Sequence, residues 1–203
     1  MNLIIKSLNF SYQSEEVFKD LNLNFSSGII NLVSGPSGSG KTTLLNLIAG
    51  LEKPSSGFIM LDDNIQSSID KFVEPENRNI GFVFQDFALF PHLNVKQNIE
   101  FSENGNKELF NTLIDNLSIK NHLSKYPHEL SGGQQQRASI ARAIYSEPKI
   151  LLIDEPISNQ DKNNKIEIIK IISDFTKDKE IVCILVSHEE INNISQVETI
   201  SYN

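Results

Sequence analysis

The segment from Gly35 to Thr42 has the composition of a phosphate-binding loop. It reads Gly-Pro-Ser-Gly-Ser-Gly-Lys-Thr and matches the pattern G-x-x-x-x-G-K-[ST] at every fixed position. Glycines let consecutive backbone N–H groups turn inward around a phosphate, and the N-terminus of a following helix adds partial positive charge. We expect Lys41 to reach the outer phosphates of a nucleotide and the Thr42 hydroxyl to bind Mg²⁺. A plain Gly/Ser turn between a strand and a helix is the alternative, but it does not require all the fixed positions. The residues expected to hold the phosphates are Gly35, Pro36, Ser37, Gly38, Ser39, Gly40, Lys41, Thr42 and Thr43.

A second group able to do chemistry is the pair of carboxylates Asp154 and Glu155, which follows the apolar run Ile150–Ile153. Adjacent residues on a strand point to opposite faces, so the two carboxylates can have different roles. Asp154 suits the Mg²⁺ shell, directly or through water. Glu155 suits polarising the water that attacks a γ-phosphate. An acidic turn after a buried strand is the alternative, and the phosphate loop upstream favours the metal and water roles.

A second anion site is predicted at Ser131-Gly132-Gly133-Gln134, before a helical pattern. Ser131 and Gln134 have capping-box spacing, so an ordinary helix start is the simpler interpretation. An ordinary cap gains nothing from glycine at its first two helical positions, where each costs up to about 1 kcal/mol. Glycines there expose backbone N–H groups to an anion. No lysine stands where Lys41 stands in the first loop, so this is half a site. A half-site most simply closes over the complete site of another subunit, which predicts a head-to-tail dimer.

The elements that must position these residues form an α/β pattern with a strand-rich start. All-apolar runs are typical of buried parallel strands, and alternating runs are typical of half-exposed antiparallel ones. The expected strands are Leu3–Phe10, Leu21–Phe25, Ile29–Val33, Gly57–Leu61, Ile80–Phe84, Ile150–Ile153 and Ile181–Val186, with a polar stretch at Gln13–Lys19. The expected helices are Thr42–Ala49, Val95–Phe101, Lys107–Asn116, Gly132–Tyr145, one around Lys162–Phe175 and a short last one.

Length and composition exclude several classes of protein. The chain has 203 residues and a net charge of −8, which argues against a general polyanion-binding surface, so we expect no nucleic-acid partner. A single cysteine, Cys183, cannot form an internal disulfide and suits a reducing compartment. The apolar run Ile181–Val186 is far shorter than the ~20 residues that span a bilayer, and no signal sequence follows Met1. We therefore expect a cytoplasmic globular protein.

Together these motifs resemble those of the ATP-binding-cassette (ABC) ATPases, in particular the nucleotide-binding subunits of bacterial importers for iron, polyamines, thiamine, sulfate and molybdate. Leu130–Gln134 is similar to the family signature LSGGQ, and Gln135-Gln136-Arg137 matches its extension. The resemblance covers essentially the whole chain. It implies a P-loop NTPase core with an N-terminal antiparallel β subdomain and an inserted α-helical subdomain. It places the core at residues 1–85 and 146–203 and the helical subdomain at residues 86–145 of one domain.

Further site residues follow from the resemblance alone. Gln85 matches the glutamine that contacts Mg²⁺ and senses the γ-phosphate, and His188 matches the switch histidine at that phosphate. Tyr12 falls where the family places an aromatic ring under adenine, and Asp161 matches an aspartate that crosses the dimer interface. Taken alone, each of these residues would be an ordinary surface or strand residue. The implied catalytic set is Glu155, His188 and Gln85, and the implied metal set is Thr42, Gln85 and Asp154.

Departures from the family pattern are small. Gln160 stands where an apolar residue is usual, so communication between subunits could differ while catalysis is retained. Only 203 − 188 = 15 residues follow His188, so an appended regulatory domain is not expected.

The apolar loop Asp86–Leu93 is expected to form a socket for a membrane subunit, unless its side chains belong to the core of the helical subdomain. The resemblance thus implies an ATPase that uses ATP and Mg²⁺ and works on the inner face of the cell membrane. Its expected partners are permease subunits, a second cassette in a homodimer and, indirectly, a solute-binding protein.

Two other functions stay open at this point. A cassette acting in translation or on DNA would carry a second cassette or a long coiled coil, yet 131 − 40 leaves about 90 residues without heptads between the two glycine motifs. An efflux or lipoprotein-release ATPase is the other alternative, and the run Ala88–Leu93 argues against it by resemblance only.

Overall fold

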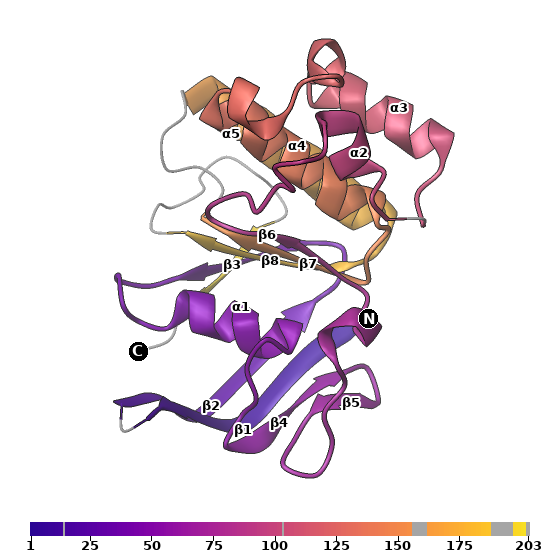
Figure 1. Cartoon of the computed structure of the whole chain (residues 1–203). Coiled ribbons are helices and arrows are strands. Elements are labelled where there is room, and N and C mark those ends of the chain that lie inside the picture. The colour runs from indigo at the N-terminus through magenta and orange to yellow at the C-terminus, as the bar shows by residue number, and fades with distance from the viewer. Residues whose placement is uncertain (14, 103, 156–161, 188–196, 202–203) are drawn as a thin grey trace.

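A computed structural model describes residues 1–13, 15–102, 104–155, 162–187 and 197–201 (Figure 1). The chain begins with an antiparallel sheet of strand order β2-β1-β4-β5. Its strands are β1 (Asn2–Tyr12), β2 (Glu15–Ser26), β4 (Ser56–Leu61) and β5 (Asn64–Ser67). The apolar alternation of β1 runs through Leu3 and Ile5 and then changes phase at Leu8. The pairing register shifts between Ile5 and Leu8, where Ser7 has a φ of 47°, so this bulge keeps both halves of the apolar pattern on the buried face.

A parallel sheet of order β6-β7-β8-β3-β9 contains four predicted strands and β9, which was not predicted. These are β3 (Ile30–Ser34), β6 (Ile80–Val83), β7 (Ile150–Asp154), β8 (Val182–Ser187) and β9 (Val197–Ser201). In β7, Leu151 and Ile153 belong to the apolar core that includes the helices of one face, and Ile150 and Leu152 belong to the core that includes α1 and the antiparallel sheet. Both faces of β7 are therefore covered, which is why Ile150–Ile153 are all apolar.

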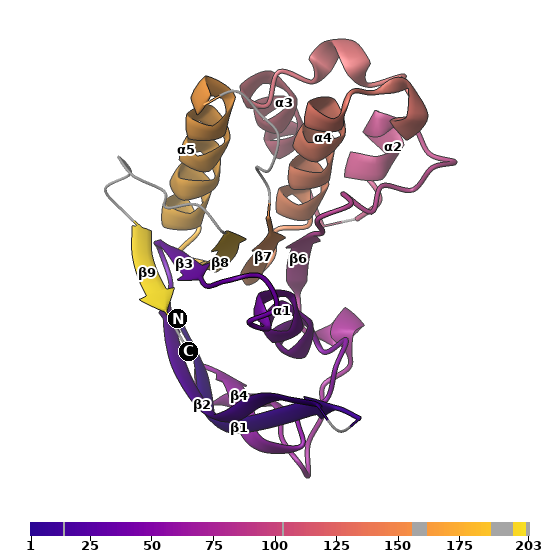
Figure 2. The same cartoon turned by 90° about the vertical axis from the view of Figure 1, so that its left-hand side faces the viewer.

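The helices cover the parallel sheet in two layers (Figures 1 and 2). Helix α1 (Lys41–Ala49) lies between the two sheets. Helices α2 (Val95–Ile99), α3 (Lys107–Asn116), α4 (Gly132–Tyr145) and α5 (Lys162–Asp178) lie on the opposite face. Short 3₁₀ helices occupy Pro75–Asn77 (η1), Lys120–His122 (η2) and Pro127–Glu129 (η3). Among the described residues, no helix is long and apolar enough to cross a membrane.

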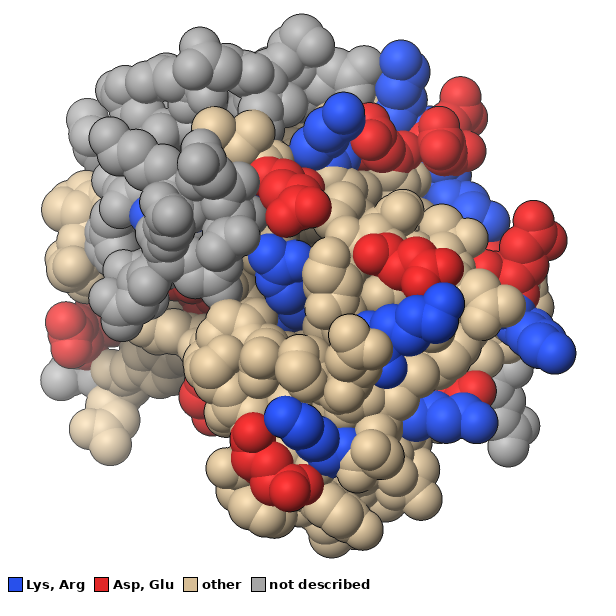
Figure 3. Space-filling model, turned by 90° about the horizontal axis from the view of Figure 1, so that it is seen from above, with Lys and Arg blue, Asp and Glu red and all other residues tan. Residues whose placement is uncertain are grey.

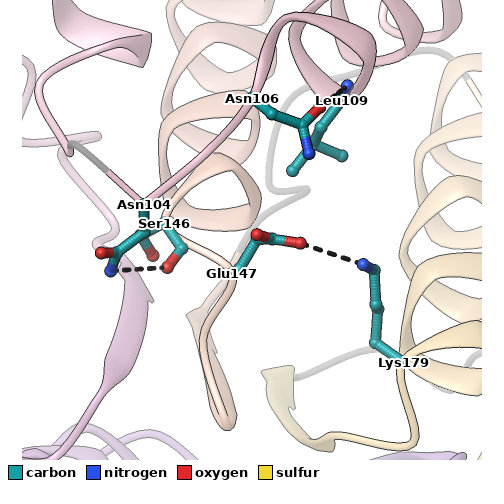
Figure 4. A network of polar contacts seen from close by, with 6 residues as sticks. All are labelled: Asn104, Asn106, Leu109, Ser146, Glu147 and Lys179. Atoms are coloured by element: carbon teal, nitrogen blue, oxygen red, sulfur yellow. Dashed lines mark hydrogen bonds and ion pairs between the residues drawn. The ribbon is translucent and has the colours of Figure 1, made fainter.

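Polar contacts tie the helical part to the core where the chain re-enters the parallel sheet (Figure 4). The Glu147 carboxylate, between α4 and β7, lies 2.9 Å from the Lys179 ammonium just after α5. The amide of Asn104 donates to the carbonyl of Ser146 at 3.2 Å, at the end of α4. Asn106 accepts from the N–H of Leu109 and so caps α3. These contacts join the segment before α3 to the end of α4, and the turn after α4 to the end of α5.

The buried Arg78 fixes the C-terminal end of α1. Its guanidinium donates to the carbonyls of Leu47 and Ile48 at 3.2 and 2.8 Å, and to the hydroxyl of Ser67 at 2.7 Å. Burial lowers the pKa of Arg78 to about 10, and the charge of Glu74 opposes that shift. A cation at the C-terminal end of a helix is favourable because the last carbonyls carry partial negative charge. The helix that follows the phosphate loop is thus anchored to the antiparallel sheet.

Most predicted elements are confirmed, with shifts at their ends. The polar stretch predicted between the first two strands is wrong from Glu15 onward, because β2 begins there and pairs with β1. Pairing with a neighbouring strand outweighs the low strand propensity of those charged residues. β5 and β9 were not predicted. The last short helix was predicted after Ile181–Val186 without bounds; residues 188–196 lie outside the described residues, and Val197–Ser201 form the strand β9 instead of a helix.

Candidate nucleotide-binding site

The predicted phosphate loop connects β3 to α1, as the motif requires. Gly38 and Gly40 have φ values of 82° and 90°, a region that glycine enters without steric cost. A Cβ on Gly40 would lie 2.8 Å from a methyl of Val17 and 2.9 Å from the ring of Phe18. The loop therefore rests against the start of β2, and only glycine fits at this contact. Gly40 is also the N-terminal cap residue of α1 and has no side chain to occupy the helix N–H groups.

Lys41 brings a buried positive charge to this loop. Its side chain is nearly inaccessible, and its ammonium donates to the carbonyls of Gly35 and Pro36, both at 2.9 Å. Ser39 turns inward, since its hydroxyl oxygen is buried without a partner among the described residues. A Cβ on Gly35 would lie 2.7 Å from that oxygen, so the loop is closely packed on its inner side. The loop thus combines exposed backbone N–H groups with one fixed cation.

A cavity of about 460 Å³ opens beside the loop. It is lined by Tyr12, Glu15, Val17, Ser37, Gly38, Gly40, Lys41, Thr42, Thr43, Gln85 and Glu155. Nine of these residues were predicted from the sequence, and they come from the end of β1, the loop and α1, and the ends of β6 and β7. Segments separated by more than a hundred residues therefore meet at one site.

One end of the cavity is formed by Tyr12 and its neighbours on β2. The Tyr12 ring is 42% exposed and meets the ring of Phe10 edge to face at 4.8 Å. Tyr12 pairs with Glu15 across the β1–β2 hairpin, which brings Glu15 into the lining. Glu15 and Val17 were missed from the sequence. The signal that could have found them is the hairpin pairing, which places residues just after Tyr12 back beside it.

The acidic end of the site lies at the carboxyl end of β7. Asp154 is 4% exposed, and strand alternation places it on the same face as Ile150 and Leu152, toward α1. Glu155 is not on the strand as predicted. It follows the last residue of β7 with a φ of 45°, so a turn rather than strand alternation directs its side chain to the cavity. The Gln85 amide donates to the Glu155 carboxylate at 3.4 Å.

The residues predicted to hold Mg²⁺ fit such an ion by their chemistry. Thr42, Gln85 and Asp154 offer hydroxyl, amide and carboxylate oxygens, which are the ligands of a hard cation. Among the described residues there is no group of three or more His, Cys, Asp or Glu side chains that could hold a metal ion. A sparse oxygen set suits Mg²⁺, which keeps several waters and shares phosphate oxygens with its substrate.

The second predicted anion site forms the N-terminus of α4. Ser131 N–H donates to the side-chain oxygen of Gln134 at 3.0 Å, and the N–H of Gln134 donates to the Ser131 hydroxyl at 3.4 Å. The capping box is therefore present. A Cβ on Gly132 would meet nothing within 4 Å, so open space lies in front of the helix end. Ser131, Gly132, Gly133 and Gln134 do not line the cavity beside Lys41. Two predicted site residues, Asp161 and His188, lie outside the described residues.

Comparison with known proteins agrees with this geometry. A family model described as ABC transporter matches residues 18–158. The chain belongs to the ABC transporter family. It is 38% identical over 196 residues to the Fe(3+) ions import ATP-binding protein FbpC of Yersinia pestis bv. Antiqua, covering 94% of this chain and 56% of that protein. It is also 38% identical over 184 residues to the molybdenum import ATP-binding protein ModC of Photorhabdus laumondii, covering 89% of this chain and 52% of that protein.

Solved structures extend the ABC assignment to three dimensions. A dimeric ATP-binding cassette in a post-hydrolysis state, bound to ADP and Pi, superimposes with a TM-score of 0.79 at 30% identity. The match covers 92% of this chain and 88% of that one. The predicted P-loop NTPase fold is therefore confirmed. The chain spans about half the length of the curated relatives it matches.

Proposed function

We propose that this chain is the ATP-hydrolysing, nucleotide-binding subunit of an ABC importer, which couples ATP binding and hydrolysis to solute transport through separate permease subunits. The observation that carries this proposal is the cavity that Tyr12, Lys41 and Glu155 line together. An aromatic ring suited to a base, a cationic loop suited to phosphates and a carboxylate suited to a water molecule share one space. The import ATP-binding proteins among the relatives favour uptake over efflux or a role away from the membrane.

The phosphates would be bound by the loop Gly35–Thr43. The N–H groups of the loop and the positive end of α1 face the phosphates, and the Lys41 ammonium pairs with their outer oxygens. It donates to two carbonyls of the same loop, so the ammonium is already held beside the backbone that would surround the phosphates. Tyr12 would stack on adenine at the other end of the cavity.

Thr42, Gln85 and Asp154 would hold Mg²⁺ in the ABC site. When bound, the ion would supply positive charge that offsets the negative charge of the phosphates. Glu155 would accept a proton from the water that attacks the γ-phosphate. The hydrogen bond from Gln85 orients that carboxylate, so a shift of Gln85 changes the position of Glu155. By resemblance, His188 would contact the γ-phosphate.

The half-site at Ser131–Gln134 supports a head-to-tail dimer of two copies. It has an exposed glycine, Gly132, and a partly buried one, Gly133, at a helix N-terminus but no lysine, and its residues are absent from the cavity beside Lys41. In the proposed dimer the Gly132 and Gly133 N–H groups of one subunit complete the γ-phosphate site of the other. Asp161 would cross the same interface.

The loop Asp86–Leu93 and the residue Phe101 are the proposed docking surface for a permease. The Phe90 ring lies 4.5 Å from the ring of Phe101, which is 62% exposed. Leu89 packs against the core, so this loop serves the helical subdomain and the surface at once. The exposed Phe101 ring beside the partly buried Phe90 and Leu89 suits an apolar face of a partner helix.

The same loop is anchored to α4, the helix that begins at the half-site. The Arg142 guanidinium donates to the carbonyls of Ala88 and Phe87 at 2.7 and 3.1 Å, and the Ser139 hydroxyl donates to Phe87 at 3.0 Å. Burial lowers the pKa of Arg142. Phe87 and Ala88 both have positive φ values, 66° and 43°, a conformation that non-glycine residues adopt only when their surroundings hold it. Displacement of this loop by a permease would therefore be transmitted to α4.

The remaining assignments complete the proposal. The helical subdomain spans residues 86–145 within one ABC domain, and the core comprises 1–85 and 146–203. The protein works on the inner face of the cell membrane, and a solute-binding protein is an indirect partner. No nucleic acid is expected, and the face in Figure 3 supports this because basic and acidic side chains are interspersed on it.

The test uses the purified chain with ATP and Mg²⁺. We expect ATP hydrolysis with a cooperative dependence on protein concentration, and light scattering that shows monomers without nucleotide. A chain that binds no ATP in titration calorimetry would overturn the ATPase assignment. A stable dimer without nucleotide would overturn the sandwich model. Co-purification of the epitope-tagged chain with an integral membrane protein, lost on replacing Phe101 with Asp, tests the docking surface.

A further inference from the structure

Both polar atoms of the Gln134 side-chain amide have a partner in the structure. Its oxygen accepts from the Ser131 N–H at 3.0 Å, and its nitrogen lies 3.2 Å from Nε2 of His122. His122 comes from η2, which packs beside the start of α4. The contact joins the ABC signature to a histidine that the proposed chemistry does not use.

The hydrogen bonds determine which atoms of this contact carry protons. A backbone N–H can only donate, so the atom of Gln134 that faces Ser131 must be the amide oxygen. The amide nitrogen, which can only donate, therefore faces His122. Nε2 of His122 must accept, so this nitrogen has no proton and the neutral ring carries its proton on Nδ1.

This tautomer leaves a donor unsatisfied. Nδ1 of His122 is buried and has no hydrogen-bond partner among the described residues. Buried polar groups without a partner are rare in folded proteins, and each has a cost. If the proton moved to Nε2, the ring would present a donor to the donor of Gln134. The inferred tautomer therefore leaves the Nδ1–H of His122 unpaired but keeps Nε2 as an acceptor for the Gln134 amide.

The backbone of His122 is fixed on both sides. Its N–H donates to the carbonyl of Ile119 at 2.9 Å, and its own carbonyl accepts from Lys125 at 3.0 Å. Ile119 is buried in the core, and the carbonyl of Lys125 accepts from Val95 at the start of α2. The ring is thus mounted on a turn that is tied to the core and to a neighbouring helix.

We propose that His122 is a positioning residue for the signature: its unprotonated Nε2 holds the Gln134 amide, which keeps the capping box closed and the N–H groups of Gly132 and Gly133 directed outward. The inference rests on the proposed function for its consequence, since those N–H groups would meet the nucleotide of a second subunit. The protonation state itself can be measured without that function.

The first measurement is the tautomer. A long-range proton–nitrogen NMR correlation on the nitrogen-15-labelled chain, without nucleotide, reports both ring nitrogens of each histidine. The spectrum of His122→Gln assigns the His122 signals by their loss. We expect the neutral Nδ1–H form near neutral pH. The Nε2–H tautomer or a doubly protonated ring would overturn the proposal.

The second measurement compares two substitutions. His122→Gln keeps an acceptor near the position of Nε2, whereas His122→Phe keeps the ring volume and removes the acceptor. Both are made in the Glu155→Gln background, and ATP-dependent dimer formation is measured by light scattering. Loss of one net hydrogen bond predicts dimerisation weaker by about five- to tenfold in the Phe variant. The Gln variant should stay within about twofold of its parent, because it retains the acceptor.

Controls separate the possible failures. ATP affinity of the monomer should be unchanged in both variants, since His122 is absent from the cavity lining. Equal dimerisation of the two variants would overturn the positioning role. If the Phe variant does not fold, the proposal is tested by the dimerisation of the Gln variant and by the measured tautomer of His122. If the parent forms no dimer with ATP, the sandwich model fails, and the tautomer still decides the position of the proton.

Discussion

Two helix N-termini with adjacent glycines serve different parts of the proposed ABC reaction. The N-cap residue of α1 is Gly40, which has no side chain to cap the helix, and the buried Lys41 is the first residue of the helix. The N-cap residue of α4 is Ser131, whose capping box with Gln134 occupies the N–H groups of both residues. The first end can therefore bind an anion with its own cation. The second has glycine N–H groups, no lysine and open space in front of it, so it can only add to a site formed elsewhere.

The difference shows why an anion motif cannot be judged by its glycines alone. At α1 the glycines permit a close approach to Val17 and Phe18, and a side chain there would collide. At Gly132 a side chain would meet nothing in the isolated chain. The proposed dimer supplies a reason for glycine at this position, because the nucleotide of another subunit would approach the backbone there.

The largest expected effect comes from a change that leaves both helix ends intact. Glu155→Gln should lower ATP turnover by about 10²–10⁴-fold, because the neutral amide cannot take the proton of the attacking water. ATP should still bind between the N-terminus of α1 in one subunit and that of α4 in the other, so a dimer should accumulate. A phosphate-release assay and light scattering measure the two outcomes. Turnover near the wild-type rate would contradict the role assigned to Glu155.

Lys41→Ala tests the complete phosphate site at the N-terminus of α1. Removing an ionic hydrogen bond to phosphate should weaken ATP affinity by about ten- to a hundredfold. Titration calorimetry on the monomer measures this effect. Lys53→Ala is a matched control, since Lys53 faces the ring of Phe72 at 5.9 Å and is absent from the cavity. Unchanged affinity in the Lys41 variant would refute the phosphate-loop interpretation.

The proposed adenine-binding part of the same cavity, at Tyr12, can be tested separately. Tyr12→Ala should weaken ATP affinity by about tenfold, as expected for the loss of one stacked ring. Tyr12→Phe keeps the ring and should bind nearly as well as the wild type. Calorimetry with ATP and with inorganic triphosphate locates the effect, because triphosphate has no base to stack. Equal losses for both ligands would show that Tyr12 acts through the loop instead.

The smallest effect is expected at the half-site. It is also the most direct test of the difference between the N-termini of α1 and α4. Ser131→Ala removes a capping hydroxyl, and the loss of about 1 kcal/mol should weaken ATP-dependent dimerisation about fivefold. The affinity of the monomer for ATP should not change. Light scattering in the Glu155→Gln background and calorimetry on the monomer give the two values. If the affinity of the monomer for ATP fell by the same factor as dimerisation, Ser131 would belong to the complete site, and the proposed difference between the two helix N-termini would be wrong.

The sequence predicted the parts of the site that depend on neighbouring residues. The phosphate loop, the Ser131 capping box and the buried strand of Cys183 all follow from local patterns. Burial raises the pKa of the Cys183 thiol to about 12, in keeping with its predicted place in the core. Gln85 was also predicted, but through family resemblance.

Contacts between distant segments could not be predicted. The Gln85–Glu155 hydrogen bond joins residues 70 positions apart, and no local periodicity records such a pairing. Glu15 enters the cavity because β2 pairs with β1, although its segment is polar in sequence. The His122–Gln134 contact depends on how η2 packs beside α4. In each case tertiary packing decides what the local sequence leaves open.

Arg78 has a consequence for genetics. Its guanidinium binds the last carbonyls of α1, and nine residues at 1.5 Å each place that end about 14 Å from the phosphate loop. Lysine has no fork of donors to serve the same carbonyls together with Ser67. A screen for alleles that lose nucleotide binding should therefore recover even the conservative Arg78→Lys exchange, far from any atom of the ligand.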